Sequence, residues 1–243
     1  FRSIEGPLGR FAETVDAFRA EGGRGLNVTL PFKLDACAYA TDLSDDARAA
    51  GAANALKFEG SRAWAQNFDG VGLVRDIAHN LGHALRAKRV LLLGAGGASR
   101  GAILPILNQA PACLFVANRT AAKASELVRS FHASGAPATL QGGGLDELGH
   151  DAFDVIINAT SASLSAETPA LPVSAFVADG LAYDMVYGKG LTPFLKLARQ
   201  AGVRHLADGA GMLVEQAAEA FAWWRGVRPE TRAMIERISS PLV

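Results

Sequence analysis

Short helical and extended patterns alternate along the first third of the chain. Phe11, Val15 and Phe18 stand at i, i+4 and i+7, which predicts a helix with one apolar face. The segment Gly25–Leu30 contains β-branched residues and alternates in polarity, which predicts a strand. Pro31 after it suits the first turn of a helix. The same patterning predicts further elements here: a helix at 45–50 capped by Ser44, strands at 54–58 and 63–68, and a helix from Val71 to Leu81.

The remainder of the chain is more regular, with apolar runs separated by helical patterns. Strands are predicted at 90–93, 114–117, 154–158 and 182–186, and helices at 100–108, 121–134, 192–201 and 211–224. Strands in series with helices between them predict a parallel sheet, because parallel neighbours need long crossover connections. The expected fold class is therefore α/β, with a smaller α/β domain followed by a doubly wound, Rossmann-like domain.

Composition and charge exclude several classes of protein. Of the 243 residues, 49% are hydrophobic and 20% are charged, which is too much apolar surface for a disordered chain. The 24 basic and 24 acidic residues give no net charge, so neither nucleic acid nor an anionic membrane is an expected partner. The two cysteines lack C-x-x-C spacing, which indicates no disulfide framework and no metal site and fits a reducing cytoplasm.

Glycine is unusually frequent, at 26 of 243 residues, and one cluster of it forms the clearest local motif. The string Gly94-Ala-Gly-Gly-Ala-Ser99 directly follows an apolar run and precedes a predicted helix. A glycine at 94 permits a tight turn, and one at 96 lets the backbone approach a pyrophosphate at the helix N-terminus. Ser99 replaces the usual third glycine, but a small residue still permits close packing. We therefore expect a dinucleotide site formed by Gly94, Ala95, Gly96, Gly97 and Ala98.

The end of the next predicted strand indicates which dinucleotide is bound. A site for NAD usually places a carboxylate there for the ribose 2′-hydroxyl, whereas a 2′-phosphate needs cationic donors. Here the strand ends in Asn118, Arg119 and Thr120, with Lys123 one turn later and no carboxylate at the strand tip. Arg119 suits a phosphate because its planar guanidinium donates several hydrogen bonds and stacks on rings. NADP is therefore the expected cofactor.

Eight strings spread along the chain carry a resemblance to a known family. They are Asn27-Val-Thr29-Leu-Pro31-Phe-Lys33, Gly51-Ala-Ala-Asn54-Ala, Asn67-Phe-Asp69-Gly70-Val-Gly72, Gly94-Ala-Gly-Gly-Ala-Ser-Arg-Gly101, Asn118-Arg-Thr120, Ile157-Asn-Ala-Thr160, Tyr183-Asp-Met185-Val-Tyr187 and Asp208-Gly-Ala-Gly-Met-Leu-Val-Glu-Gln216. Together, and in this order from about Phe11 to Trp224, they resemble the shikimate dehydrogenases.

The resemblance implies a reaction and a set of site residues. The reaction is reversible hydride transfer between NADP and C3 of 3-dehydroshikimate, on the pathway to aromatic amino acids. Lys33 and Asp69 match the family's catalytic pair. The implied substrate contacts are Thr29, Asn54, Asp69, Tyr187 and Gln216, and the implied cofactor contacts are Gly94 to Ala98, Asn118, Arg119, Thr120, Lys123, Met185 and Gly209.

Lys33 suits carbonyl reduction, because a positioned ammonium stabilises the developing negative oxygen and donates the proton. A nearby Asp69 carboxylate favours the charged lysine, so we expect Asp69 mainly to orient Lys33 and a substrate hydroxyl. The resemblance also implies two domains around a cleft: a substrate domain at 1–72, an NADP-binding domain at 73–215, and C-terminal helices at 216–243 that return toward the substrate domain. No metal is expected, and both a monomer and a homodimer are compatible with the fold.

One feature of the family is not found in the sequence. The family's leading strand and helix carry a Ser-x-Ser pair for the substrate carboxylate, and no such pair occurs near Phe1. Ser161-Ala-Ser163 has the spacing but lies in a loop after a cofactor-domain strand, so the role is not transferred to it. We expect the working protein to include a leading segment that this sequence does not contain.

Three alternatives remain open. A quinate/shikimate dehydrogenase would share the fold but often prefers NAD, against which Arg119 argues. A non-catalytic, NADP-binding regulatory protein is possible if the chain begins at Phe1, because it would bind the cofactor without a complete substrate site. A methylenetetrahydrofolate dehydrogenase shares the two-domain plan, but the first half of the chain lacks that family's motifs.

Overall fold

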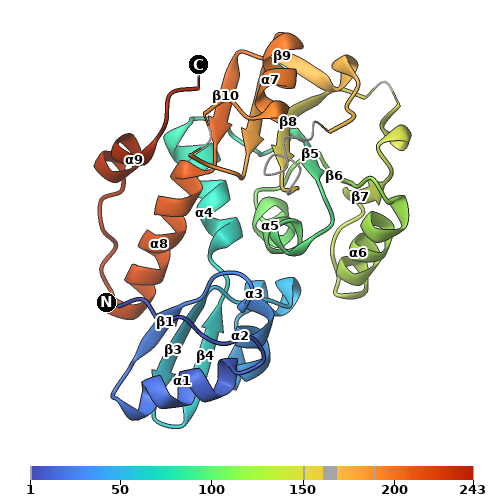
Figure 1. Ribbon diagram of the computed structural model, residues 1–243. Coiled ribbons are helices and arrows are strands. Elements are labelled where there is room, and N and C mark those ends of the chain that lie inside the picture. Colours follow the sequence, from blue (N-terminus) through green and yellow to red (C-terminus); the bar gives the residue numbers. More distant parts are fainter. Residues whose placement is uncertain (1, 150, 161–168, 189, 243) are drawn as a thin grey trace.

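The described part of the chain forms two sheets that are joined by helices (Figure 1). The computed structural model describes residues 2–149, 151–160, 169–188 and 190–242. The small sheet is built from residues before 67 and the large one from residues after 88. Ser161 and Ser163 lie outside the described residues.

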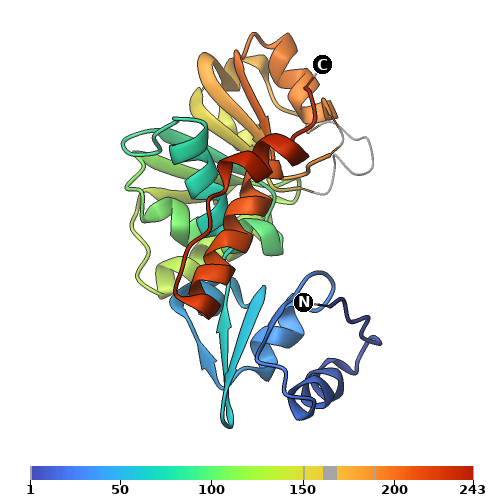
Figure 2. The same ribbon diagram turned by 90° about the vertical axis from the view of Figure 1, so that its left-hand side faces the viewer.

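The small sheet has four strands in the order β1-β3-β4-β2. They are β1 (Gly25–Asn27), β2 (Asp42–Leu43), β3 (Ala55–Glu59) and β4 (Arg62–Gln66). β3 is antiparallel to both β1 and β4, and β2 is parallel to β4. Helices α1 (Phe11–Ala20) and α2 (Lys33–Tyr39) lie on one face of the sheet (Figure 2), and α3 (Asp45–Ala50) follows β2. Buried Val15, Ala36, Leu56 and Phe58 belong to the apolar core of this part.

The large sheet is six-stranded and entirely parallel, in the order β10-β9-β8-β5-β6-β7. Its strands are β5 (Arg89–Leu93), β6 (Cys113–Ala117), β7 (Leu140–Gly143), β8 (Phe153–Asn158), β9 (Phe176–Asp184) and β10 (His205–Asp208). Helices α5 (Gly97–Leu107) and α6 (Ala121–Ala133) contribute to the core on one face, and α7 (Pro193–Gln200) to the core on the other. The strand order reverses between β5 and β8, which is where ligands bind in doubly wound folds.

Two helices run between the sheets and pack side by side. These are α4 (Asp69–Arg75), which continues as a π-helical turn, η1 (Asp76–Asn80), and α8 (Ala210–Arg225). The helices approach closely at Gly72, where a Cβ would lie 2.7 Å from the backbone nitrogen of Gln216. The far end of α8 reaches the small sheet, since Trp224 Nε1 donates a hydrogen bond to the carbonyl of Leu56 over 3.0 Å. A short helix, α9 (Arg232–Ile238), lies near the C-terminus.

The predicted fold class is confirmed, and most predicted elements are present with boundaries shifted by a few residues. The strand predicted at Gly25–Leu30 ends at Asn27, and the helix expected to start at Pro31 begins at Lys33. The helix predicted from Val71 begins at Asp69 and changes to a π-helical turn at Asp76. Three strands were not predicted from the sequence: β2, β7 and β10.

Among the described residues, no helix combines the length and apolar character that crossing a membrane requires. The same residues contain no group of three or more His, Cys, Asp and Glu side chains arranged to hold a metal ion.

Candidate active site

Lys33 and Asp69 stand at the first positions of two helices, α2 and α4. Lys33 Nζ donates a hydrogen bond to Asp69 Oδ2 over 2.6 Å, although 36 residues separate them in the chain. The side chain of Lys33 is 25% exposed and that of Asp69 is 18% exposed. The ion pair is therefore partly shielded from water yet open to a small molecule, as an acid–base group must be.

Asn54 joins this pair to the helix α8. Its Nδ2 donates to Asp69 Oδ1 over 3.0 Å and to Gln216 Oε1 over 3.1 Å. Its Oδ1 accepts a hydrogen bond from the backbone nitrogen of Phe68 over 2.9 Å. Asn54 is buried, and these three bonds use both amide hydrogens and the carbonyl oxygen. The structure thus brings four of the predicted site residues, Lys33, Asn54, Asp69 and Gln216, into one hydrogen-bonded group.

A further residue, Asn67, positions Asp69, although it was not among the predicted site residues. Asn67 Oδ1 accepts a hydrogen bond from the Asp69 backbone nitrogen over 3.1 Å, and its Nδ2 donates to the carbonyl of Ala52 over 3.0 Å. This geometry is an Asx turn, in which an Asn side chain caps a backbone N–H two residues later. An Asn two residues before a helix start was the available signal.

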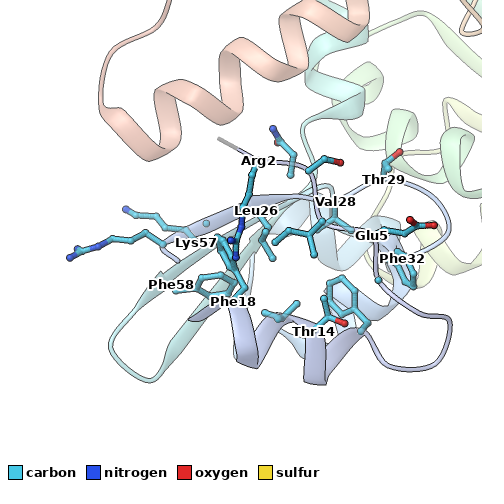
Figure 3. A pocket seen from close by; sticks show the side chains of 18 of the residues that line it. Arg2, Glu5, Thr14, Phe18, Leu26, Val28, Thr29, Phe32, Lys57 and Phe58 are labelled. Carbon is cyan, nitrogen blue, oxygen red and sulfur yellow. The ribbon is translucent and has the colours of Figure 1, made fainter. Parts of the chain in front are cut away.

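The structure does not join Thr29 and Tyr187 to this group. Both are exposed, and neither side chain hydrogen-bonds to another described residue. Thr29 lies at the rim of an open groove of about 1450 Å³ between residues 2–8, α1 and β1 (Figure 3). Lys33, Asn54, Asp69 and Gln216 do not line that groove. The groove is thus separate from the hydrogen-bonded group at the start of α4.

The glycine-rich turn after β5 has the shape that a dinucleotide pyrophosphate requires. Gly94 is buried with a φ of +103°, a conformation that side-chain-bearing residues rarely adopt. A Cβ at Gly96 or Gly97 would meet nothing within 4 Å, so the backbone at the start of α5 faces open space. Gly96 is the N-cap of α5 and supplies no side-chain cap, which leaves the first helical N–H groups available for an anion. The residues present therefore fit the cofactor.

The structure places the other predicted cofactor contacts at the carboxyl end of the same sheet. Arg119, Thr120 and Lys123 are exposed where β6 leads into α6. Asn118 Nδ2 donates to the carbonyl of Thr120 over 3.0 Å, which fixes the shape of this turn. Met185 and Gly209 come from different strand ends, yet the Met185 carbonyl directly contacts the position that a Cβ of Gly209 would occupy.

Two buried carboxylates lie behind the site, where α4 and η1 pack on α8. Burial raises the pKa of Asp76, although hydrogen bonds from Asn80 and Tyr183 act against it. Burial would also raise the pKa of Glu215, but hydrogen bonds from Asn80 and Thr231 and the charge of Arg228 outweigh it, so that pKa is lowered. Neither residue was predicted from the sequence, because most of their hydrogen-bond partners are distant along the chain.

Comparison with known proteins shows which family this chain resembles. Family models match residues 1–56 (shikimate dehydrogenase substrate binding domain), 76–170 (shikimate / quinate 5-dehydrogenase) and 209–238 (shikimate 5′-dehydrogenase C-terminal domain). The chain is 52% identical to the shikimate dehydrogenase (NADP(+)) of Nitrosospira multiformis over 242 residues, covering 100% of this chain and 87% of that protein. It is 54% identical to the protein of the same name from Dechloromonas aromatica, covering 97% and 85% of the two chains.

Solved structures are also similar to this chain over nearly all of its length. An Ael1 enzyme from Pseudomonas putida superimposes with a TM-score of 0.93 at 55% identity, covering 99% of this chain and 87% of that one. Shikimate 5-dehydrogenase from Thermus thermophilus, solved with NADP(H) and shikimate, gives a TM-score of 0.82 at 30% identity, covering 95% and 84%. With such identity along nearly all of its length, the chain belongs to the shikimate dehydrogenase family.

Proposed function

We propose that this protein catalyses the reversible, NADPH-dependent reduction of 3-dehydroshikimate to shikimate, in the synthesis of aromatic amino acids. Its curated relatives are NADP-dependent shikimate dehydrogenases, so the quinate-specific and NAD-dependent alternatives are not favoured. The observation that carries the proposal is the 2.6 Å contact between Lys33 Nζ and Asp69 Oδ2, held beside Asn54 and Gln216.

The residues divide the chemistry between them. NADPH held at the glycine-rich turn would supply the hydride for the carbonyl carbon. Lys33 donates the proton to the carbonyl oxygen and stabilises its negative charge as that charge develops. Asp69 orients Lys33 through their 2.6 Å hydrogen bond, and it accepts a hydrogen bond from a substrate hydroxyl. In the reverse direction Lys33 starts as the neutral amine and accepts the alcohol proton, so both directions use the same two side chains.

Substrate recognition is assigned to polar groups around this pair. Asn54 and Gln216 are already fixed by hydrogen bonds, and Asn54 keeps one lone pair on Oδ1 and Gln216 one hydrogen on Nε2 for substrate hydroxyls. Thr29 and Tyr187 are proposed as further contacts, and their exposed hydroxyls have no hydrogen-bond partner among the described residues. A site that pairs each substrate hydroxyl strongly rejects analogues that lack one.

Cofactor binding is assigned to the carboxyl end of the large sheet. Gly94, Ala95, Gly96, Gly97 and Ala98 bind the pyrophosphate, and Asn118, Arg119, Thr120 and Lys123 bind the 2′-phosphate and adenosine. The cationic side chains of Arg119 and Lys123 support the preference for NADP, because a 2′-phosphate needs positive partners. Met185 and Gly209 follow β9 and β10, on the opposite side of the β5–β8 switch point from the turn after β6, so we assign them to the nicotinamide end.

We also propose the domain division at 1–72, 73–215 and 216–243. Its two boundaries fall inside α4 and α8, so these helices connect the substrate and cofactor domains. The protein acts on a small molecule and has no nucleic-acid partner, as its zero net charge suggests. We place it in the cytoplasm as a monomer or homodimer, and its two cysteines are unpaired, as in a reducing compartment.

The test uses the purified protein and follows the absorbance of the reduced cofactor, NADPH or NADH. Shikimate and quinate are each offered with NADP and with NAD, which separates the candidate activities in one assay. We expect turnover with shikimate and NADP to exceed the other three combinations by at least about tenfold, the factor that 1.4 kcal/mol provides. Greater turnover of quinate with NAD would contradict the proposal, and NADP binding without any turnover would favour a regulatory protein.

A further inference from the structure

A buried hydrogen bond connects β9, the strand that leads to the proposed cofactor contact Met185, to the helix that begins with Asp69. Tyr183, near the end of β9, donates its hydroxyl to Asp76 Oδ2 over 2.7 Å. Tyr183 is fully buried and Asp76 is 3% exposed. Burial and the neighbouring Asp76 charge raise the pKa of Tyr183 well above its ordinary value, so the phenol keeps its proton and is the donor.

Each partner of this hydrogen bond lies a few residues along the backbone from a proposed catalytic or cofactor-binding residue. Asp76 directly follows α4, seven residues after Asp69, which corresponds to about 10 Å along a helix. Tyr183 stands two residues before Met185, which we assign to the nicotinamide end of the cofactor. The bond therefore joins the two elements whose relative position sets how far the hydride donor lies from the Lys33–Asp69 pair.

Additional contacts restrict movement of Asp76. Its Oδ1 accepts a hydrogen bond from Asn80 Nδ2 over 2.9 Å, and the same nitrogen donates to Glu215 Oε1 over 3.0 Å. Glu215 immediately precedes Gln216 in α8. Gly211, in the first turn of α8, lies so close that a Cβ there would collide with the Asp76 carboxylate. The position of α4 is thus fixed both to β9 and to α8.

The surroundings make a purely stabilising role a poor explanation for this pair. Tyr183 belongs to an apolar core that also contains Ile77, Leu181 and Ala207. A carboxylate buried beside such residues loses hydration, and an apolar pair of similar volume is often as stable or more stable. A hydrogen bond, unlike apolar packing, fixes the relative position of its two partners, because it weakens steeply when its length or angle changes.

We propose that Tyr183 and Asp76 are a positioning pair, which holds α4 against the strand β9. This contact keeps Lys33 and Asp69 at the correct distance from the nicotinamide when the substrate is bound. The inference rests on the roles proposed above for Lys33 and Asp69. Neither Tyr183 nor Asp76 touches the reacting atoms. Misplacement by about 1 Å is enough to slow a reaction about a hundredfold, so a loosened contact changes the chemical step before it changes binding.

The primary test compares Tyr183→Phe with Tyr39→Phe. Tyr39 also donates its hydroxyl to a carboxylate, Asp16 Oδ1 over 2.6 Å, but it lies within the small sheet's helical layer. We expect Tyr183→Phe to lower kcat about tenfold, with both KM values within about twofold, and to raise the deuterium isotope effect measured with NADPH labelled at the transferred position. Tyr39→Phe is expected to leave kcat and the isotope effect unchanged.

Several outcomes would overturn the positioning pair. These are a wild-type kcat and isotope effect in Tyr183→Phe, an equal loss of kcat in both tyrosine variants, or a rise in KM with kcat unchanged. Asp76→Asn, which keeps an oxygen for Tyr183, should retain more kcat than Asp76→Ala, and equal losses would also contradict the inference. Lys33→Met is measured alongside, because a wild-type kcat in that variant would instead refute the proposed catalytic roles.

Discussion

Lys33 and Asp69 each occupy the first position of a helix, and their charged groups meet at 2.6 Å across the join between the two parts of the molecule. One helix lies on the small sheet, and the other packs against the helices of the large sheet. The contact between the two proposed catalytic residues thus exists only when both parts are assembled. This dependence determines how variants of the site should behave.

Replacing Lys33 with Met should nearly abolish turnover. The variant keeps an unbranched side chain but has no proton to donate, and general acid–base groups contribute a factor of about 10²–10⁴. We therefore expect kcat to fall at least a hundredfold, while the NADPH dissociation constant measured by fluorescence stays within about twofold. Lys57→Met is the control, because Lys57 also forms an ion pair, with Glu59 at 2.7 Å. A Lys33→Met variant with near-normal kcat would refute the assignment.

Replacing Asn54 with Ala should weaken substrate binding as well as stability. Three hydrogen bonds are lost, and the buried N–H of Phe68 is left without its acceptor. An unsatisfied buried donor costs about 1–3 kcal/mol, measured as the free energy of unfolding in urea. The KM for shikimate should rise at least about tenfold, because Asp69 and Gln216 lose their shared partner.

The matched control for Asn54 is Ser44→Ala. Ser44 caps α3 by accepting a hydrogen bond from the Ala47 nitrogen over 3.1 Å, and losing such a cap costs about 1 kcal/mol. It should lower stability without changing the KM for shikimate. Similar KM values in the two variants would show that Asn54 acts through stability alone.

Replacing Arg119 with Ala should reduce the preference for NADP over NAD. A charged hydrogen-bond partner contributes about 1.5–3 kcal/mol, which corresponds to a factor of about 10–100 in affinity. The KM for NADP should therefore rise by at least about tenfold, while the KM for NAD, which has no 2′-phosphate, should change little. Arg129→Ala, on the exposed surface of α6, is the control. Equal losses for the two cofactors would show that Arg119 does not contact the 2′-phosphate.

Replacing Glu215 with Gln should destabilise the protein more at neutral than at acid pH. Glu215 accepts hydrogen bonds from Arg75, Arg228, Asn80 and Thr231. Its pKa is lower in the folded protein than its ordinary value of 4.5, because the hydrogen bonds and the Arg228 charge outweigh burial. A carboxyl with a lowered pKa stabilises the fold above its ordinary pKa and loses that contribution as pH falls through the folded pKa.

The cost of Glu215→Gln is expected to be about 2–3 kcal/mol at pH 7, below the range for a fully buried ion pair because both arginines are partly exposed. It should shrink steadily as pH falls below about 4.5, the ordinary value for a glutamate carboxyl. Urea unfolding of the variant and the wild type at several pH values measures this difference in the free energy of unfolding. Glu236→Gln, which breaks an exposed pair with Arg232, should have no effect at any pH, and a pH-independent cost for Glu215→Gln would contradict the assignment.

Local patterns in the sequence predicted the strongly periodic elements and the turn at Gly94. Residues 90–93 of the strand β5 are an unbroken apolar run, and the glycines after it leave few alternatives to a tight strand–helix turn. The motif strings also identified Lys33, Asn54, Asp69 and Gln216, which the structure brings together. The strand β7, Leu140–Gly143, was missed, because two of its four residues are glycines with low strand propensity. It forms because the outer edge of β6 offers unpaired backbone groups.

By itself, then, the sequence determined the order and type of the main elements, the dinucleotide turn and the chemical groups available for catalysis. Only the tertiary structure decided how those groups are held. Asn54 meets Gln216 across 162 residues of chain, and Tyr183 meets Asp76 across 107. Local propensity carries no information about such pairs, because a hydrogen bond between distant residues depends on the packing of whole elements. For that reason Asp76, Tyr183 and Glu215 became visible only once α4, α8 and β9 were in place.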